Sequence, residues 1–116
     1  MEKRRRLREN ADFQRLRREG RTLARPLVVL SFLPNGLGYT RVGFAVGKRI
    51  GKAVVRNRIK RRMREAVRRR LQEGQIVEGW DIVLIARRPI VEASFQQVDE
   101  TIGLLLRRAG LMGEVL

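Results

Sequence analysis

The sequence contains neither cysteine nor histidine, so it can form no disulfide and offers no thiolate nucleophile and no imidazole base. The same absence removes the nitrogen and sulfur ligands of zinc sites. The acidic residues are scattered, and the adjacent pair Asp99 and Glu100 would point in different directions on a helix and would not share a metal ion or a proton. The sequence therefore shows no set of side chains suited to catalysis.

Long apolar runs and aromatic residues are also scarce. No stretch approaches the roughly 18 to 20 apolar residues that a membrane-spanning helix needs, and the basic start, MEKRRRLREN, lacks the apolar segment of a secretory signal. The chain has one Trp, one Tyr and four Phe, none within residues 48–70, whereas helices that bind membrane surfaces carry bulky aromatics on their buried face. These absences favour a cytoplasmic protein with no membrane partner.

Positive charge is what the sequence has in excess. Its 27 Lys and Arg against 12 Asp and Glu give a net charge of +15. Most of the excess lies in residues 48–70, KRIGKAVVRNRIKRRMREAVRRR, where Glu65 is the only acid. Like charges four residues apart on a helix destabilise it by roughly 0.2–0.5 kcal/mol per pair, so an anionic partner is needed to offset the repulsion. Nucleic acid is the commonest such partner.

Hydrophobic periodicity and turn residues divide the chain into elements in the order α-β-β-β-α-β-α. The expected elements are a helix at 10–20, extended segments at 21–34, a hairpin turn at 34–38, a return strand at 39–48, a long helix at 52–73, a strand at 80–87 and a last helix at 94–109. The 116 residues suffice for one domain, in which the basic residues 1–9 are expected to be mobile. This order predicts an α+β fold with helices packed on a small mixed sheet.

The long helix at 52–73 is expected to have two different faces. Its apolar residues recur at steps of three and four and form one stripe, made of Val55, Ile59, Met63, Ala66, Val67 and Leu71. A second stripe on the far side is made of Asn57, Arg61, Arg64 and Arg68. At 1.5 Å per residue such a helix is about 30 Å long, so its basic face can follow many phosphates.

Several single residues have two readings from sequence alone. Asn10 can cap the first helix and Gly20 can end it. The spacing of Phe13 favours packing against the core over contact with a ligand. Gly43 lies on a nearly bare strand face, which suits packing and also admits a nucleic-acid backbone. Asn57 can cap the first turn of the long helix or donate to a phosphate or a base.

Three stretches resemble the protein subunit of bacterial ribonuclease P. RVGFAVGKRIGKAVVRNRIKRRMREAVRR at 41–69 is similar to the family's signature, and RLRENADFQRLRREGR at 6–21 and GWDIVLIAR at 79–87 resemble its first helix and last strand. The resemblance implies a ribonucleoprotein in which a large RNA, with Mg²⁺ bound mainly by that RNA, removes the 5′ leader of precursor tRNA. One protein per RNA assists the reaction. The resemblance also implies a ribosomal protein S5 domain 2-like fold, whose crossover through the long helix is left-handed although such crossovers are generally right-handed.

The resemblance also assigns roles to residues. In the family the arginine-rich helix contacts the catalytic RNA, and a cleft between the first helix and the sheet holds the single-stranded leader. The RNA contacts fall on Lys48, Arg49, Lys52, Arg56, Asn57, Arg58, Lys60, Arg61, Arg64 and Arg68. The cleft falls on Phe13, together with Arg17 and Leu30, which stand where other members carry aromatics. An arginine at position 17 can still stack on a base or meet a phosphate.

Two other classes of function also fit a small basic α+β domain. One is a structural RNA-binding protein such as a ribosomal protein, and the other is a DNA-binding protein of the nucleoid. Cleavage of precursor tRNA with added catalytic RNA, sedimentation with ribosomes and binding to duplex DNA would distinguish the three.

Overall fold

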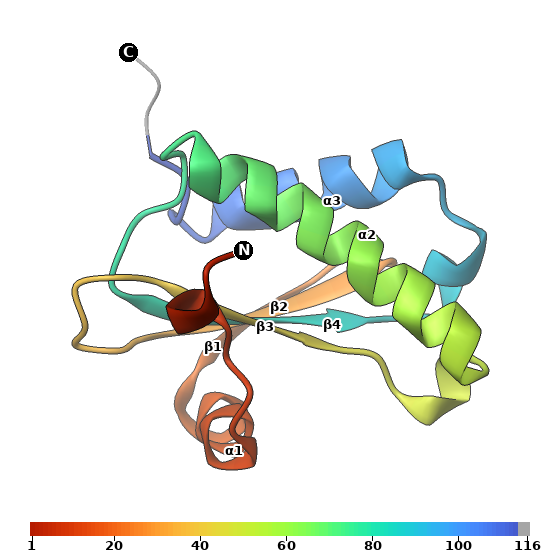
Figure 1. Ribbon diagram of the computed structural model, residues 1–116, viewed down its shortest axis with the longest axis horizontal. Helices are drawn as coiled ribbons and strands as arrows, with labels where there is room; N and C mark the ends of the chain where they lie inside the picture. Colours follow the sequence, from red (N-terminus) through yellow and green to blue (C-terminus); the bar gives the residue numbers. More distant parts are fainter. Residues whose placement is uncertain (114–116) are drawn as a thin grey trace.

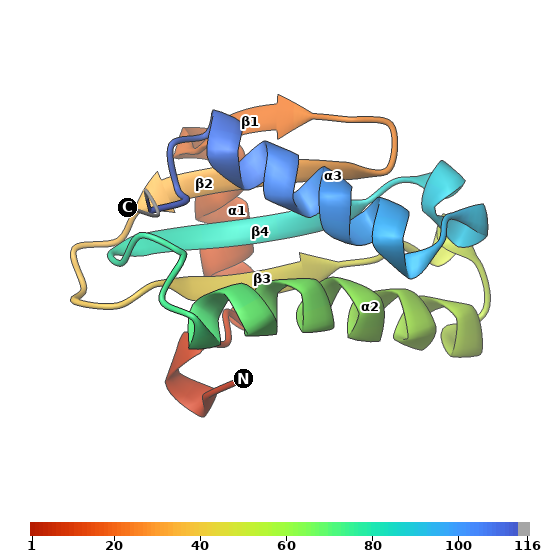
Figure 2. The ribbon, with the colours of Figure 1, turned by 90° about the horizontal axis from the view of Figure 1, so that it is seen from above.

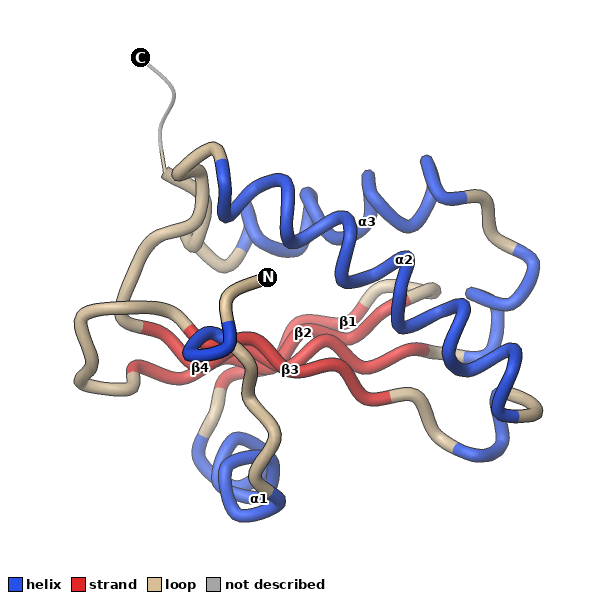
Figure 3. Tube along the Cα trace, in the orientation of Figure 1, coloured by secondary structure: helices blue, strands red, loops and turns tan. Residues whose placement is uncertain are grey.

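The computed structural model describes residues 1–113, which form one four-stranded sheet with helices on both faces. The strands are β1 (Arg21–Ala24), β2 (Val28–Pro34), β3 (Arg41–Ala45) and β4 (Trp80–Ala86), in the order β1-β2-β4-β3. β2 is antiparallel to β1 and β4, whereas β3 and β4 are parallel. Figure 3 shows the strands as one layer with helices above and below it. The mixed sheet confirms the predicted fold class.

Three α-helices are distributed unequally over the two faces of the sheet. They are α1 (Asn10–Glu19), α2 (Ala53–Gln72) and α3 (Phe95–Arg108). α2 and α3 lie side by side on one face, and α1 lies alone on the other (Figure 1). Short 3₁₀ helices at Lys3–Arg5, Lys48–Ile50 and Arg88–Glu92 are the other helical elements of residues 1–113. The element order is the predicted one.

The connection from β3 through α2 to β4 is left-handed. In Figure 2, which is viewed from the side of α2, β3 and β4 both point to the right and β4 lies above β3. This arrangement confirms the crossover expected from the resemblance and departs from the general right-handed preference.

The hairpin expected at residues 34–38 is wrong, because β4 lies between β2 and β3. β4 takes this central place because both of its faces are covered: Ile82 faces α2 and α3, and Val83 faces α1. Asn35 instead organises a wider loop, since its side-chain amide donates to the Tyr39 carbonyl (3.1 Å) and its side-chain oxygen accepts from the Leu37 N–H (2.8 Å). The tight hairpin joins β1 and β2, where the Arg25 N–H donates to the Val28 carbonyl.

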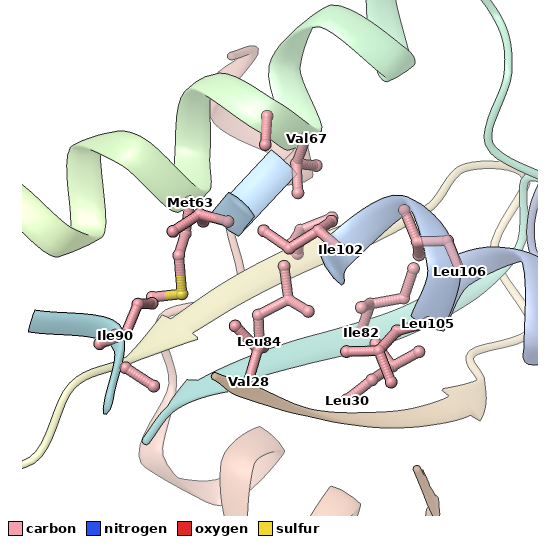
Figure 4. Close-up of a cluster of buried hydrophobic side chains, with 14 of the residues drawn as sticks. Val28, Leu30, Met63, Val67, Ile82, Leu84, Ile90, Ile102, Leu105 and Leu106 are labelled. Atoms are coloured by element: carbon pink, nitrogen blue, oxygen red, sulfur yellow. The ribbon is translucent and has the colours of Figure 1, made fainter. Parts of the chain in front are cut away.

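The main core lies between the sheet and the pair α2 and α3 (Figure 4). The predicted apolar stripe of α2 is confirmed: Ile59, Met63, Ala66 and Val67 are buried, and Val55 and Leu71 pack at its margin. The other side chains of this core include Val28, Leu30, Ile82, Leu84, Val98, Ile102, Leu105 and Leu106. Full burial of such a side chain contributes roughly 1.5–3 kcal/mol, so this layer supplies most of the hydrophobic stabilisation.

The helix ends follow the sequence in most places. Ser94 caps α3 in a capping box with Gln97, whose N–H donates to the Ser94 hydroxyl at 3.1 Å. Gly74 follows α2 with a φ of +68°, a conformation that favours glycine. Asn10 is not the cap of α1: the helix already includes it, Glu9 occupies the N-cap, and no side-chain hydrogen bond caps this end. Gly20 ends α1 as expected, because a Cβ there would lie 2.5 Å from the Leu16 carbonyl oxygen.

The basic segment 1–9, expected to be mobile, makes specific contacts with the sheet. Leu7 is buried, and its N–H donates to the Val42 carbonyl at 3.0 Å along the edge of β3. The Arg5 guanidinium donates to both carboxylate oxygens of Glu78, at 2.7 and 2.8 Å. The segment thereby extends the protein surface beside β3.

Asp81 joins α1, β3, β4 and the loop after β2. Its carboxylate is fully buried and accepts two hydrogen bonds from Arg41, at 2.8 and 2.7 Å, and one from Asn35 at 3.0 Å. Arg15 of α1 donates to the same carboxylate, and Asp12 lies 3.7 Å from both arginines. Burial disfavours the charged form of Asp81, but the hydrogen bonds and charges of these partners outweigh it, so its pKa lies below the ordinary value.

Replacing Asp81 by Asn should destabilise the protein while keeping the shape of the side chain. We expect the free energy of unfolding at pH 7 to fall by about 2 kcal/mol, because hydrogen bonds to charged groups contribute about 1.5–3 kcal/mol. A carboxylate with a lowered pKa stabilises the fold above its unfolded pKa, and that contribution is lost as the pH falls through the folded pKa. The difference between parent and variant should therefore shrink below pH 4.

Urea unfolding at pH 7 and pH 3 measures this effect. Glu19→Gln is the control, since Glu19 is exposed and pairs with no side chain in residues 1–113. A difference between Asp81→Asn and the parent that is the same at both pH values would contradict the assignment.

Candidate nucleic-acid interface

The predicted RNA-contacting residues lie on and just before α2, on the side away from the core. Lys48, Arg49, Lys52, Asn57, Arg58 and Arg61 are exposed, and Arg56, Lys60, Arg64 and Arg68 are half-buried. We call these ten residues the α2 basic face. They come together because the apolar stripe turns the opposite side of the helix outward.

Other arginines of α2 serve the packing of the helix pair. Arg70 donates to the Asp99 carboxylate of α3 at 2.7 Å and crosses α3 at Gly103, where a Cβ would lie 2.7 Å from its guanidinium. Arg69 also lies within 3.3 Å of Asp99, and Arg62 donates to the Ala93 carbonyl at 2.9 Å. These three residues were not among the predicted RNA contacts, and the structure gives them internal partners.

The α2 basic face, by contrast, is almost free of internal partners. Within residues 1–113, only Arg68 of this set makes an ion pair, a double hydrogen bond to Glu65 at 3.0 and 2.6 Å. The hydrogen bonds from Arg68, with a smaller contribution from the charge of Arg69, lower the pKa of Glu65, so the acid stays charged. The Nε of Arg56 is buried and has no hydrogen-bond partner in the same part of the chain. The remaining cations are available to an external anion.

Asn57 does not cap α2. The helix begins at Ala53 with Lys52 as its N-cap, so Asn57 stands in the second turn, exposed and without a side-chain hydrogen bond to residues 1–113. The capping alternative is therefore wrong, and donation to a phosphate or a base stays a prediction.

A basic hollow with two aromatic rings lies between α1, β3 and α2. It is lined by Phe13, Phe44, Lys60 and Arg64, with Arg6, Arg8, Leu7, Met1, Val42 and Gly43. The Arg64 guanidinium lies over the Phe44 ring, 5.7 Å from its centroid. The N-terminal segment supplies Arg6 and Arg8, which sequence reasoning did not assign to any site. The combination of aromatic rings and cations suits unpaired nucleotides.

Phe13 belongs to both a packing cluster and this hollow. It packs against Leu7, Leu16 and Val83, and its ring fits over Gly43, where a Cβ would lie 2.7 Å from the ring. The packing interpretations of Phe13 and Gly43 are thus both confirmed. Because Phe13 is only half-buried, part of its ring still faces the hollow.

Leu30 does not line the cleft, which corrects the assignment made by resemblance. Its side chain is fully buried in the main core, on the opposite face of the sheet from α1. Alternation along β2 puts Val29 and Ser31 on the α1 face instead. Ser31 is buried beside α1. Val29 of β2 pairs with Ile85 of β4, and Ile85 pairs with Ala45 of β3, so these three residues form a row across the sheet. The helix α1 covers this row incompletely, since Ile85 is 37% exposed.

The incompletely covered part of the α1 face of the sheet is therefore the row Val29, Ile85 and Ala45. We call this row, with the adjoining face of α1, the cleft. Arg17 is exposed on α1, one turn after Phe13, and makes no ion pair with residues 1–113. Strict two-residue alternation, applied to β2 and β4, would have found Val29 and Ile85 from the sequence.

Comparison with known proteins decides between the candidate classes. The family model described as Ribonuclease P matches residues 1–110. The chain belongs to the ribonuclease P protein family. Membership implies a role in processing the 5′ end of tRNA together with an RNA subunit, as part of an endoribonuclease. The ribosomal and nucleoid alternatives are thereby set aside.

Individual ribonuclease P proteins are similar over most of their length. The protein component from Roseiflexus castenholzii is 48% identical over 114 residues, 92% of this chain and 87% of that protein. The component from Caldanaerobacter subterraneus is 40% identical and covers 97% of this chain and 96% of that protein. The structure of the Staphylococcus aureus RNase P protein has a TM-score of 0.85 at 32% identity, over 94% of this chain and 98% of that one. The Thermotoga maritima protein has a TM-score of 0.80 at 38% identity, over 89% and 96%.

Removing one cation of the α2 basic face should weaken RNA binding in a salt-dependent way. For Arg61→Ala we expect lower affinity for the catalytic RNA, and a slope of log K against log [salt] that is smaller by about one per lost phosphate contact. Folding should be unaffected, because Arg61 is exposed and makes no ion pair with residues 1–113. Arg107→Ala, which removes an exposed cation at the end of α3, is the matched control. Equal slopes for parent and Arg61→Ala would refute this role for Arg61.

Polyvalent anions should stabilise the isolated protein. A ligand that binds only the folded state at a hundredfold excess over its Kd adds about 2.7 kcal/mol. Thermal unfolding in phosphate or sulfate should therefore show a higher Tm than in chloride at matched ionic strength. A neutral excluded osmolyte controls for preferential exclusion. The same Tm in all the salts would argue against an anion site.

Proposed function

We propose that the chain is the RNA-binding cofactor of ribonuclease P, with one protein per catalytic RNA. The α2 basic face binds that RNA, and the cleft beside α1 binds the single-stranded leader of precursor tRNA. The observation that carries the proposal is the contrast within α2: Arg62, Arg69 and Arg70 have partners in α3 or the segment before it, whereas the cations of the α2 basic face have almost none. Ordinary packing does not account for cations left unpaired in this way.

We assign the cleavage chemistry to the RNA and its Mg²⁺ ions. Within residues 1–113, no three acidic side chains gather as a group that could hold a metal ion, and magnesium is usually bound by carboxylates together with phosphates. Bound metal supplies the activation of water and the stabilisation of the leaving oxygen, and the protein's part is to bind and position RNA.

The hollow and the cleft suit a leader for complementary reasons. Phe13 offers a ring on which a base can stack, the cations around it can meet the phosphates, and the row Val29, Ile85 and Ala45 leaves room for an extended strand. Precursor and mature tRNA differ by the leader, so the protein should favour the precursor. None of the helices in residues 1–113 is long and apolar enough to cross a membrane, and we propose that the complex acts in the cytoplasm.

The affinity of the reconstituted enzyme for precursors of increasing leader length tests the cleft. With protein, affinity should rise with leader length until the leader fills the cleft, whereas the RNA alone should show little dependence. Phe13→Leu should weaken precursor binding about tenfold, within the roughly 1–3 kcal/mol that stacking contributes per base. Binding of mature tRNA should be unchanged.

A second pair of variants separates the cleft from general destabilisation. Ile85→Glu places a negative charge in the cleft, and Val77→Glu places one at an equally exposed site outside it, the two side chains being 37% and 38% exposed. Only Ile85→Glu should reduce the ratio of the affinity for precursor tRNA to the affinity for mature tRNA. Circular dichroism must first show that each variant is folded, above all Phe13→Leu, because Phe13 also packs over Gly43. If the protein raised the affinity for leaderless and full-leader tRNA equally, the cleft would not bind the leader. Only the binding of the catalytic RNA by α2 would then stand.

A further inference from the structure

Phe95 is a phenylalanine whose position the core does not explain. It is the first residue of α3 and is half-buried. Phe32 and Phe44 belong to the main core or pack against it, and Phe13 packs in the second cluster, but Phe95 is a member of neither. A large apolar ring outside the hydrophobic clusters calls for another role.

The surroundings of Phe95 are cationic. The ring lines a hollow of about 440 Å³ together with five arginines of α2 and one acid, Glu65. Among the arginines are Arg58, Arg61 and Arg62. The Arg69 guanidinium lies over the ring, 5.5 Å from its centroid. Figure 2 shows why these residues meet: α2 and α3 run side by side, and both begin at the same end of the molecule. The hollow lies over the α2 basic face and on the α3 side of it.

Neighbouring contacts hold this arrangement in place. Arg62 donates to the Ala93 carbonyl, and Arg69 is paired with Asp99, so two of the cations beside the ring are fixed by α3 and the segment before it. The Ser94–Gln97 capping box fixes the first turn of α3, and with it the backbone of Phe95. The ring is therefore presented in a defined position and needs little ordering on binding.

We propose that Phe95 is a stacking platform for an unpaired base of the catalytic RNA, with the neighbouring arginines on the phosphates that flank the base. Aromatic rings set among cations bind unpaired nucleotides in this way, and the hollow joins the α2 basic face that binds the same RNA in the proposed function, on which this inference rests. The leader is a less suitable occupant, because Phe95 lines a different hollow from Phe13. The cationic lining likewise argues against an apolar protein partner.

Variants at Phe95 test the proposal through affinity for the catalytic RNA, measured over a range of salt concentrations. We expect Phe95→Ala and Phe95→Leu to weaken binding about tenfold, and Phe95→Tyr to bind within about twofold of the parent. The salt slope should stay unchanged, since a stacked base carries no counterion release. Leu37→Ala, which shortens an exposed apolar side chain in the loop after β2, is the control and should have no effect.

A spectroscopic readout distinguishes stacking from a change in folding. The parent has a single tryptophan, Trp80, which packs near Phe32 in the main core. In Phe95→Trp, the added indole should be quenched when the catalytic RNA binds, whereas the emission of the parent should change little. A leader oligonucleotide alone should not produce the quenching. Thermal unfolding of each variant should match the parent within a few degrees, because Phe95 lies outside both clusters.

The outcomes separate this inference from the function on which it rests. If the parent binds the catalytic RNA and Phe95→Ala binds equally well at every salt concentration, the stacking role is wrong and the proposed function stands. If Phe95→Ala changes only the affinity for precursor tRNA, the ring contacts the substrate and the assignment to the catalytic RNA is overturned. If the parent itself does not bind the catalytic RNA, the proposed function fails.

Discussion

Mutual repulsion among the cations is the constraint on which this structure depends. In a protein with 27 basic residues and 12 acidic ones, three carboxylates lie where they hold elements together. Asp81 fixes α1 through Arg15, Asp99 fixes α3 against α2 through Arg70, and Glu78 holds the N-terminal segment through Arg5. Many of the cations left over are displayed on the α2 basic face, where an RNA can neutralise them.

This division of charge also brings two RNA-binding surfaces close to each other. The hollow with Phe13 lies on the β3 side of α2, and the hollow with Phe95 adjoins α3. Arg64 lines both hollows, so α2 forms the wall between them. A protein built in this way can hold the catalytic RNA and the substrate leader at once. The affinity of each surface for RNA then depends on how firmly α2 is held. The long apolar stripe of this helix packs in the main core and holds it in place.

Local rules predicted much of this arrangement. The two faces of α2 and the bounds of this helix follow from side-chain spacing and from backbone preferences of single residues. The hairpin at 34–38 failed because strand order depends on long-range pairing: β4 is apolar on both faces and enters between β2 and β3. The assignment of Leu30 to the cleft is wrong because the alternation of side chains along β2 places Leu30 in the main core. The partners of Asp81 come from three distant segments, so no local pattern could identify them.

Because the chain contains no cysteine, a single introduced cysteine can carry a photo-crosslinker at a unique position. The most direct test of two separate surfaces compares Asn57→Cys, on the α2 basic face, with Ile85→Cys, in the cleft, in the enzyme reconstituted with the catalytic RNA and a precursor tRNA. Crosslinks from position 57 should map to the catalytic RNA, and those from position 85 to the leader. Crosslinks from both positions to the same RNA, or the reverse pattern, would contradict the account.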